Sequence, residues 1–221
     1  MLIVLLACGD EENAVRSSDQ EFFPLRKGFY QVYDVEEINY PRLGVTEESF
    51  YQLKTEVVDS FFNEQGGYTY TLHRSKRNTV TDPWIFQQVW SVRRNTANVV
   101  VSEENTPFIK LVFPAVRNRQ WDGNALNSLP VDDYELSQTG ASYPLENGTI
   151  AGDYLRVIQE DSGDAFNDNQ REEVYVRNIG LVYRANRVIE YCSTEGQCDI
   201  TAHVIDNGKV YVQTLVEYGQ N

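Results

Sequence analysis

The residues that could perform acid–base or nucleophilic chemistry are few and scattered along the chain. The two histidines, His73 and His203, each lie in a run typical of a strand, where a histidine is more often a surface or hydrogen-bonded residue than a catalytic base. The chain contains no Gly-x-Ser-x-Gly elbow, no His-Glu-x-x-His pair and no glycine loop of the kind that binds phosphate. The sequence therefore predicts no catalytic residue, no cofactor and no enzyme.

Paired carboxylates are the one catalytic arrangement that the sequence leaves open, because two of them can cleave a glycosidic bond. The adjacent pairs are Glu103-Glu104 and Glu172-Glu173. Neighbouring residues on a strand point to opposite faces, so the members of one pair would not converge. We expect these residues to be solvated charges at the rim of the fold, and a carboxylate hydrolase is the least favoured hypothesis.

An oxygen-rich segment, residues 160–169, has the composition of a calcium loop. Asp161, Asp164 and Asp168 are weak calcium candidates, since their oxygens do not recur at EF-hand spacing around a central glycine. A polar hairpin loop is the favoured interpretation. Cys192 and Cys198 with His203 fit no standard zinc spacing, and no metal site is predicted there.

Aromatic side chains offer another chemistry, which is stacking on a sugar or a peptide. The candidate ligand-binding aromatics are Trp84, Trp90 and Trp121, with Tyr68 and Tyr70 on neighbouring runs. The competing and favoured interpretation is that most aromatic residues belong to the core, since aromatic and β-branched residues pack half-buried sheets.

Five residues lie between Cys192 and Cys198, in a loop between two predicted strands. Residues at the end of a hairpin are close enough for a disulfide, and an exported protein meets an oxidising compartment. We predict a disulfide between them. Cys8 is then the unpaired cysteine.

The first eight residues are an apolar run that ends in a small residue and a cysteine. The segment Leu5-Leu6-Ala7-Cys8 resembles the lipobox of bacterial lipoproteins. The resemblance implies that residues 1–7 are the remnant of a signal peptide and that acyl chains such as palmitate are attached to Cys8 after cleavage. The alternative is an ordinary first strand that ends in a buried cysteine.

Residues 8–21 form an acidic stretch without apolar periodicity, which predicts a solvated tether behind the lipidated cysteine. Two or more acyl chains hold a protein stably on a membrane. The acidic residues also resemble the surface-export signal of Bacteroidota lipoproteins. We expect a protein of the cell envelope, anchored to the outer membrane through Cys8 and facing either the periplasm or the cell surface.

Two further segments carry a family resemblance. The first is Phe23-Pro24-Leu25 followed by Gly28, and the second is the run of residues 178–184, Asn-Ile-Gly-Leu-Val-Tyr-Arg. Together they resemble a set of uncharacterised bacterial envelope lipoproteins of Bacteroidota type, which carry an FPL…G opening motif and a GLV.R late strand. The resemblance implies an all-β envelope lipoprotein and brings no catalytic residues with it.

The body, residues 22–221, is predicted to be a single β-rich domain. Short runs rich in Tyr, Val, Phe and Thr alternate with Gly, Asn, Pro and Asp, which is typical of strands and turns. Hairpins are predicted at residues 65–67 and 95–98, and the sequence Asp-Asn-Gly-Lys at residues 206–209 is the strongest hairpin signal. About eleven strands indicate an all-β fold with a single antiparallel curved sheet, either a half-barrel or barrel, or a sandwich.

Composition limits the partners. With 221 residues and a net charge of −14, the chain lacks the basic surface that nucleic-acid binding needs. No run of 18 or more apolar residues occurs. The favoured hypothesis is an anchored, non-catalytic binding or scaffold domain with room for an apolar ligand, in the manner of a lipid carrier. The alternative is a surface-exposed module that recognises a glycan or a protein.

Overall fold

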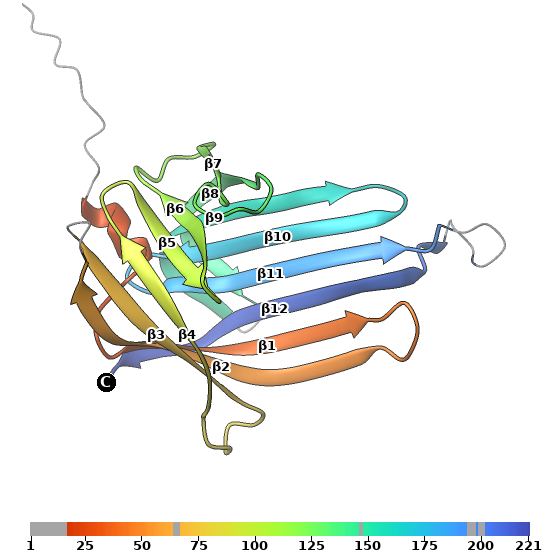
Figure 1. Ribbon diagram of the computed structural model, residues 1–221, viewed down its shortest axis with the longest axis horizontal. Helices are drawn as coiled ribbons and strands as arrows, with labels where there is room; N and C mark the ends of the chain where they lie inside the picture. The colour runs from red at the N-terminus through yellow and green to blue at the C-terminus, as the bar shows by residue number, and fades with distance from the viewer. Residues whose placement is uncertain (1–16, 64–66, 146–147, 194–197, 199–201) are drawn as a thin grey trace, which may run out of the picture.

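The computed structural model describes residues 17–63, 67–145, 148–193, 198 and 202–221. In these residues, one antiparallel sheet of twelve strands curls into a nearly closed barrel (Figure 1). The strand order is β6-β5-β4-β3-β2-β1-β12-β11-β10-β9-β8-β7, so the sheet is an up-and-down meander in which the first and last strands also pair. The predicted fold class, an all-β single antiparallel curved sheet, is confirmed.

The elements have the following bounds: η1 (Ser17–Phe22), β1 (Phe29–Tyr40), β2 (Glu47–Phe62), β3 (Tyr68–Arg77), β4 (Ile85–Arg94), β5 (Asn98–Glu103), β6 (Thr106–Val112), β7 (Gln120–Asp122), β8 (Asp133–Leu145), β9 (Gly148–Gly163), β10 (Asn167–Val176), β11 (Gly180–Tyr191) and β12 (Ile205–Gln220). No helix in this described part of the chain is long and apolar enough to cross a membrane.

The two edges of the sheet, β6 and β7, approach each other and nearly close the barrel. The Ile109 backbone N–H donates a hydrogen bond to the Gly123 carbonyl at 2.9 Å. The indole Nε1 of Trp121 donates to the Ile109 carbonyl at 2.9 Å. An edge strand whose backbone groups are hydrogen-bonded within the barrel does not offer those groups for pairing with a strand of another chain.

One end of the barrel is closed by η1 and the segment that leads into β1, at the left of Figure 1. Phe22 and Leu25 are 3% and 6% exposed and join a core that includes Leu72 and Tyr175. The carboxylate of Asp19, itself buried, accepts a hydrogen bond from the Ala115 backbone at 3.0 Å. Residues 17–21, which the sequence assigned to the tether, are therefore part of the folded body.

The two segments that carry the family resemblance pack against each other at this closed end. The side-chain amide of Gln31 donates to the carbonyls of Ile179 and Leu181, at 2.9 and 2.7 Å. Gly180 has a φ of +89°, and a Cβ there would lie 3.1 Å from Pro24. Glycine is required because the backbone is left-handed and the space is filled. These residues join the chain's opening turn to β11.

The strongest hairpin signal proved to be wrong. Residues 206–209 lie inside β12, where Gly208 pairs with Ile189 of β11. A Cβ at Gly208 would lie 2.5 Å from the Val188 carbonyl oxygen, so the glycine permits close approach of two strands rather than a turn. The hairpin at residues 95–98 is confirmed, with Asn95 Oδ1 accepting from the backbone of Ala97.

Other turns follow the prediction in part. The polar segment of residues 161–170 contains a tight turn between β9 and β10, and the strands extend into it from both sides. Residues 65 and 66 of the predicted hairpin at 65–67 lie outside the described residues, as do residues 1–7 and Cys8. Cys192 and Cys198 are joined as predicted, with their Cα atoms 6.4 Å apart.

Candidate functional site

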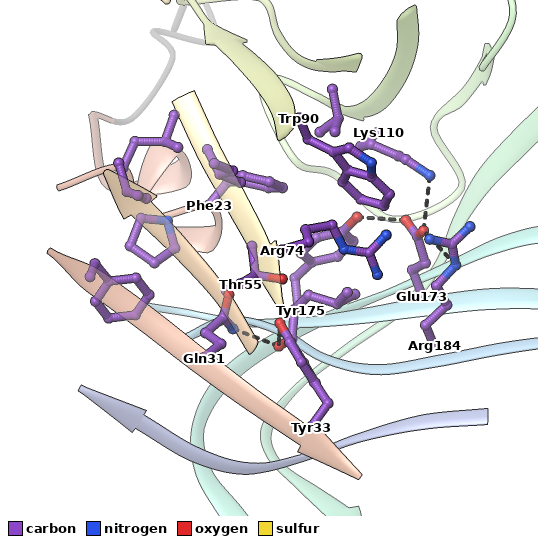
Figure 2. A pocket seen from close by; sticks show the side chains of 18 of the residues that line it. Phe23, Gln31, Tyr33, Thr55, Arg74, Trp90, Lys110, Glu173, Tyr175 and Arg184 are labelled. Atoms are coloured by element: carbon purple, nitrogen blue, oxygen red, sulfur yellow. Dashed lines mark hydrogen bonds and ion pairs between the residues drawn. The ribbon is translucent and has the colours of Figure 1, made fainter. Parts of the chain in front are cut away.

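A cleft of about 740 Å³ opens into the barrel interior, and none of its lining residues belongs to η1. It narrows to an inner cavity of about 60 Å³, and Arg74, Trp90, Glu103 and Arg184 line both spaces. Figure 2 shows three of them, Arg74 on β3, Trp90 on β4 and Arg184 on β11, extending into the same space. The interior is thus open at one end and closed at the other.

Two carboxylates and two cations form a cluster of ion pairs at the floor of the cleft (Figure 2): Glu103, Glu173, Lys110 and Arg184. The ammonium Nζ of Lys110 lies 2.9 Å from Oε1 of Glu103 and 3.0 Å from Oε1 of Glu173. Arg184 lies 3.6 Å from each of the same carboxylates. The Tyr175 hydroxyl donates to Oε2 of Glu173 at 2.5 Å. The four charges balance, which is the condition for keeping them out of water.

Local strand geometry places these four residues. Glu173 on β10 is directly opposite Arg184 on β11, so the pair forms a cross-strand contact on the inner face. Lys110 has no partner on β5, because Val100 pairs with Ile109 and the next pair is Val99 with Leu111. Lys110 is therefore the extra residue of a β-bulge, which turns its side chain toward the interior.

Both carboxyls are held ionised by their cationic neighbours. Burial alone raises the pKa of Glu103, but the charges of Lys110 and Arg184 outweigh burial and hold that pKa at about 2. Burial opposes the ionisation of Glu173 in the same way, and the same two cations lower its pKa. A general acid needs a pKa near the working pH, so this pair is not arranged for acid–base catalysis at neutral pH.

Above this cluster, Arg74 lies flat against an aromatic ring. Its guanidinium carbon is 3.7 Å from the centre of the Trp90 ring, a close cation–π contact. With the Gln88 amide in the orientation that its surroundings favour, the amide oxygen accepts from Nη1 of Arg74 at 2.9 Å and from Nε1 of Trp90 at 3.2 Å. Arg74 and Trp90 are thus fixed before any ligand arrives.

The outer walls of the cleft combine phenol rings and lysines. Lys76 Nζ lies 3.6 Å from the centre of the Tyr51 ring. Lys209 pairs with Glu37 at 2.5 Å, and Tyr211 completes the wall between them. The cleft therefore offers stacking surfaces together with fixed positive charges.

The three tryptophans named by the sequence lie in different places. Trp90 lines the cleft. Trp84 instead packs on the guanidinium of Arg77, whose central carbon is 4.2 Å from the ring centre. Trp121 makes an edge contact with the Tyr134 ring at 5.9 Å and packs against the core. The structure does not bring the three together in one groove.

The two candidate tyrosines lie near the closed end. Tyr70 packs against the core, whereas Tyr68 is 53% exposed and makes an edge contact with the ring of Phe62 at 5.6 Å. Of the five aromatic candidates, Trp90 is the one that lines the cleft in the described residues, and Tyr51, Phe108 and Tyr211 are aromatic lining residues that the sequence did not indicate.

The expectation that both adjacent glutamate pairs are solvated rim charges is wrong for their inner members. The side chains of Glu103 and Glu173 are 16% and 1% exposed. Glu172 turns to the other face, as predicted for neighbours on a strand, and pairs with Arg156 at 2.5 Å. Glu104 lies in the turn after β5 and lines the same cleft as Glu103, so the prediction of opposite faces is wrong for that pair.

The weak calcium candidates have protein partners. Asp164 Oδ1 accepts from the backbone of Phe166 at 2.7 Å, and Asp168 pairs with Arg187 at 2.5 Å. Asp161 lies on β9 opposite Gln170. In the part of the chain that the structure describes, no three His, Cys, Asp or Glu residues are grouped closely enough to hold a metal ion.

Sequence analysis missed the cationic residues of the cleft. A signal for Arg74 was present, because it alternates with Leu72 on β3 and therefore shares the face of a buried leucine. Glu173 likewise shares a face with Tyr175. No such signal exists for Lys110, whose direction depends on the bulge.

These residues define an all-β protein with an open, charged cleft inside a nearly closed barrel. No protein-family model and no curated protein matches the chain. Among solved structures, the chain is similar to a protein from Parabacteroides distasonis that is described as a "putative lipoprotein". The TM-score is 0.46 at 11% sequence identity, over 90% of this chain and 98% of that chain.

Proposed function

We propose that this protein is a lipoprotein of the cell envelope, and that its β domain is a non-catalytic binding module with the barrel cleft as its ligand site. The observation that carries the proposal is the cleft of about 740 Å³, a volume within the range of small-molecule sites. Buried polar groups held in fixed positions line it, as Arg74 and Arg184 illustrate. A domain that only acted as a spacer would have no need for such groups.

The lining favours a polar ligand over an acyl chain. The more apolar inner cavity measures about 60 Å³, which is room for roughly two water molecules. The larger space is bordered by Arg74, Lys76 and Glu104. An acyl chain placed there would displace water from these groups without pairing them. Of the ligand classes that the sequence left open, a glycan or a peptide therefore fits better than a lipid.

Anchoring at Cys8 rests on the lipobox resemblance and on the distance to the folded body. Ser17, where η1 begins, is nine positions after Cys8 in the sequence, with eight residues between them. Such a chain reaches at most about 30 Å. The closed end of the barrel would thus face the membrane, and the cleft would open away from it.

The anchor is tested by replacing Cys8 with serine in the full chain expressed in its own envelope. The variant should leave the membrane fraction, whereas the unaltered chain should sediment with membranes after a salt wash. A Cys8→Ser variant that still sediments after the wash would rule out the anchor.

The ligand site is tested by native mass spectrometry of the chain purified gently from its envelope. A bound polar molecule should be found, should be lost in Trp90→Ala and should be retained in Trp84→Ala. Trp84 is the matched control, because it also stacks on an arginine but lies outside the cleft. A bound mass retained equally in both variants, or a bound fatty acid, would contradict the proposed site.

A further inference from the structure

Arg74 is a buried cation beside the ion-pair cluster, and in the described residues it forms no ion pair with the carboxylates of that cluster. The residue is 9% exposed. Nη1 is accounted for by Gln88, and the hydroxyl of Tyr211 also interacts with the guanidinium. Its Nε is buried and has no hydrogen-bond partner among the described residues. None of the ion pairs found in those residues includes Arg74.

An unpaired donor on a buried guanidinium is costly, because both the charge and the N–H have been removed from water. Burial lowers the pKa of Arg74 and Arg184 lowers it further, so the nearby Tyr211 and Glu103, which raise that pKa, do not offset the loss of hydration. The neighbouring cluster shows that this fold can supply carboxylates to buried cations, since Lys110 receives two. The missing partner at Arg74 is therefore a specific feature of the site.

Charge around the cleft points in the same direction. Five cationic side chains and three acidic ones line the cleft and the inner cavity, an excess of two positive charges: Arg74, Lys76, Lys110, Arg184 and Lys209 against Glu103, Glu104 and Glu173. Glu37, just outside the lining, offsets Lys209. The whole chain carries a net charge of −14, so the cleft is a positive region in an acidic protein.

We propose that the cleft binds a ligand through an oxyanion, a carboxylate or a phosphate group, which pairs with the guanidinium of Arg74, whose Nε–H has no partner in the described residues, and adds a negative charge that no ion pair of Arg74 provides. A guanidinium edge and an oxyanion match in geometry and charge. The rings of Tyr51 and Tyr211 would contact the rest of the ligand. This inference rests on the proposed function, because it names the chemical class that the same cleft takes.

The test is calorimetric titration of the full chain carrying Cys8→Ser with three probes of similar size: D-glucuronate, D-glucose 6-phosphate and D-glucose. At least one of the two anions should bind at least about tenfold more tightly than glucose. Which anion binds better distinguishes a carboxylate from a phosphate ligand. Arg74→Met should weaken that binding at least about tenfold, and Arg77→Gln, on the opposite face of the same strand and outside the lining of the cleft, by less than about threefold.

The thermal unfolding of the variants separates binding from folding. Without ligand, Arg74→Met should keep or raise the unfolding temperature, since an unpaired buried charge has been removed. Should Arg74→Met fail to fold, Arg74→Lys keeps the charge but lacks the Nε donor, and should also weaken anion binding. Glucose bound in the cleft as tightly as both anions, or anion binding unchanged in the Arg74 variants, overturns the oxyanion inference and leaves the cleft as a ligand site. Failure of all three probes to bind at tens of millimolar also overturns the oxyanion inference. The proposed binding function is then tested separately, by native mass spectrometry of the chain purified from its envelope.

Discussion

The two halves of the barrel interior are built from the same strands but are stabilised differently. Strand β3 shows the change within five residues, since Leu72, Arg74 and Lys76 all face inward. Near η1, apolar side chains fill the space and leave a cavity of about 60 Å³. Further along, charged side chains hold one another and leave about 740 Å³ open.

The difference shows how one curled sheet can provide both a core and a site. Close packing of apolar groups removes empty volume, because every unfilled space loses contacts. An ion pair is held by the attraction between its charges and by its hydrogen bonds, and it does not require the surrounding space to be filled. A cluster such as Lys110 with Glu103 and Glu173 can therefore form the floor of an open cleft. The closed half contributes apolar packing, and the open half contains the cleft that we propose as the ligand site.

The largest effect should come from breaking the cluster on one side. Lys110→Met leaves two buried carboxylates with Arg184 as their remaining cation at 3.6 Å. We expect a loss of about 3–5 kcal/mol in the free energy of unfolding, measured in urea. Lys27→Met is the control, because Lys27 is 72% exposed in its pair with Asp59 and should cost less than about 1 kcal/mol. Equal losses in the two variants would refute the structural role of the cluster.

A cavity in the closed half should cost stability without affecting the cleft. Leu72 is 5% exposed, and Leu72→Ala should lower the free energy of unfolding by about 2–5 kcal/mol. Ligand binding should be unchanged under conditions where the variant is folded, because Leu72 does not line the open cleft. A parallel loss of affinity and stability would mean that the two halves are not separable.

Acid should weaken the charged half. The pKa of Glu103 is about 2 in the fold against an ordinary value of 4.5, so its contribution is complete above pH 4.5 and is lost as the pH falls toward 2. This depression corresponds to roughly 3 kcal/mol. The unfolding temperature should fall through that range, and Glu103→Gln should flatten the fall. An unfolding temperature independent of pH between 4.5 and 2 would be incompatible with the ion pairs described.

Much of the fold followed from the sequence because strand periodicity is local. About eleven strands were predicted and the described residues form twelve, while the three-residue β7 (Gln120–Asp122) carries too short a pattern to detect. The Asn-Gly signal at residues 207 and 208 failed because glycine serves equally well for a turn and for a close approach of strands. Which of these it serves depends on the neighbouring strand.

The site was harder to predict because it depends on long-range register and on bulges. Trp90 was indicated by its residue type alone. Arg74 could have been placed from the alternation on β3, but its lack of a partner is visible only when the barrel has closed. Lys110 and Glu173 are 63 residues apart in sequence, and no spacing rule relates them. Buried charge is a property of the assembled sheet.

The most direct test is a two-dimensional proton–nitrogen spectrum of the full chain carrying Cys8→Ser, recorded while sodium D-glucuronate or D-glucose 6-phosphate is added. Saturable shifts should appear at the Arg74 Nε–H and at the Trp90 indole N–H, which share the cleft. The Trp121 indole, bonded to the Ile109 carbonyl at the barrel edge, should stay in place. Shifts of equal size at Trp90 and Trp121, or none at Arg74 with either anion, would contradict a binding site in the open half of the barrel.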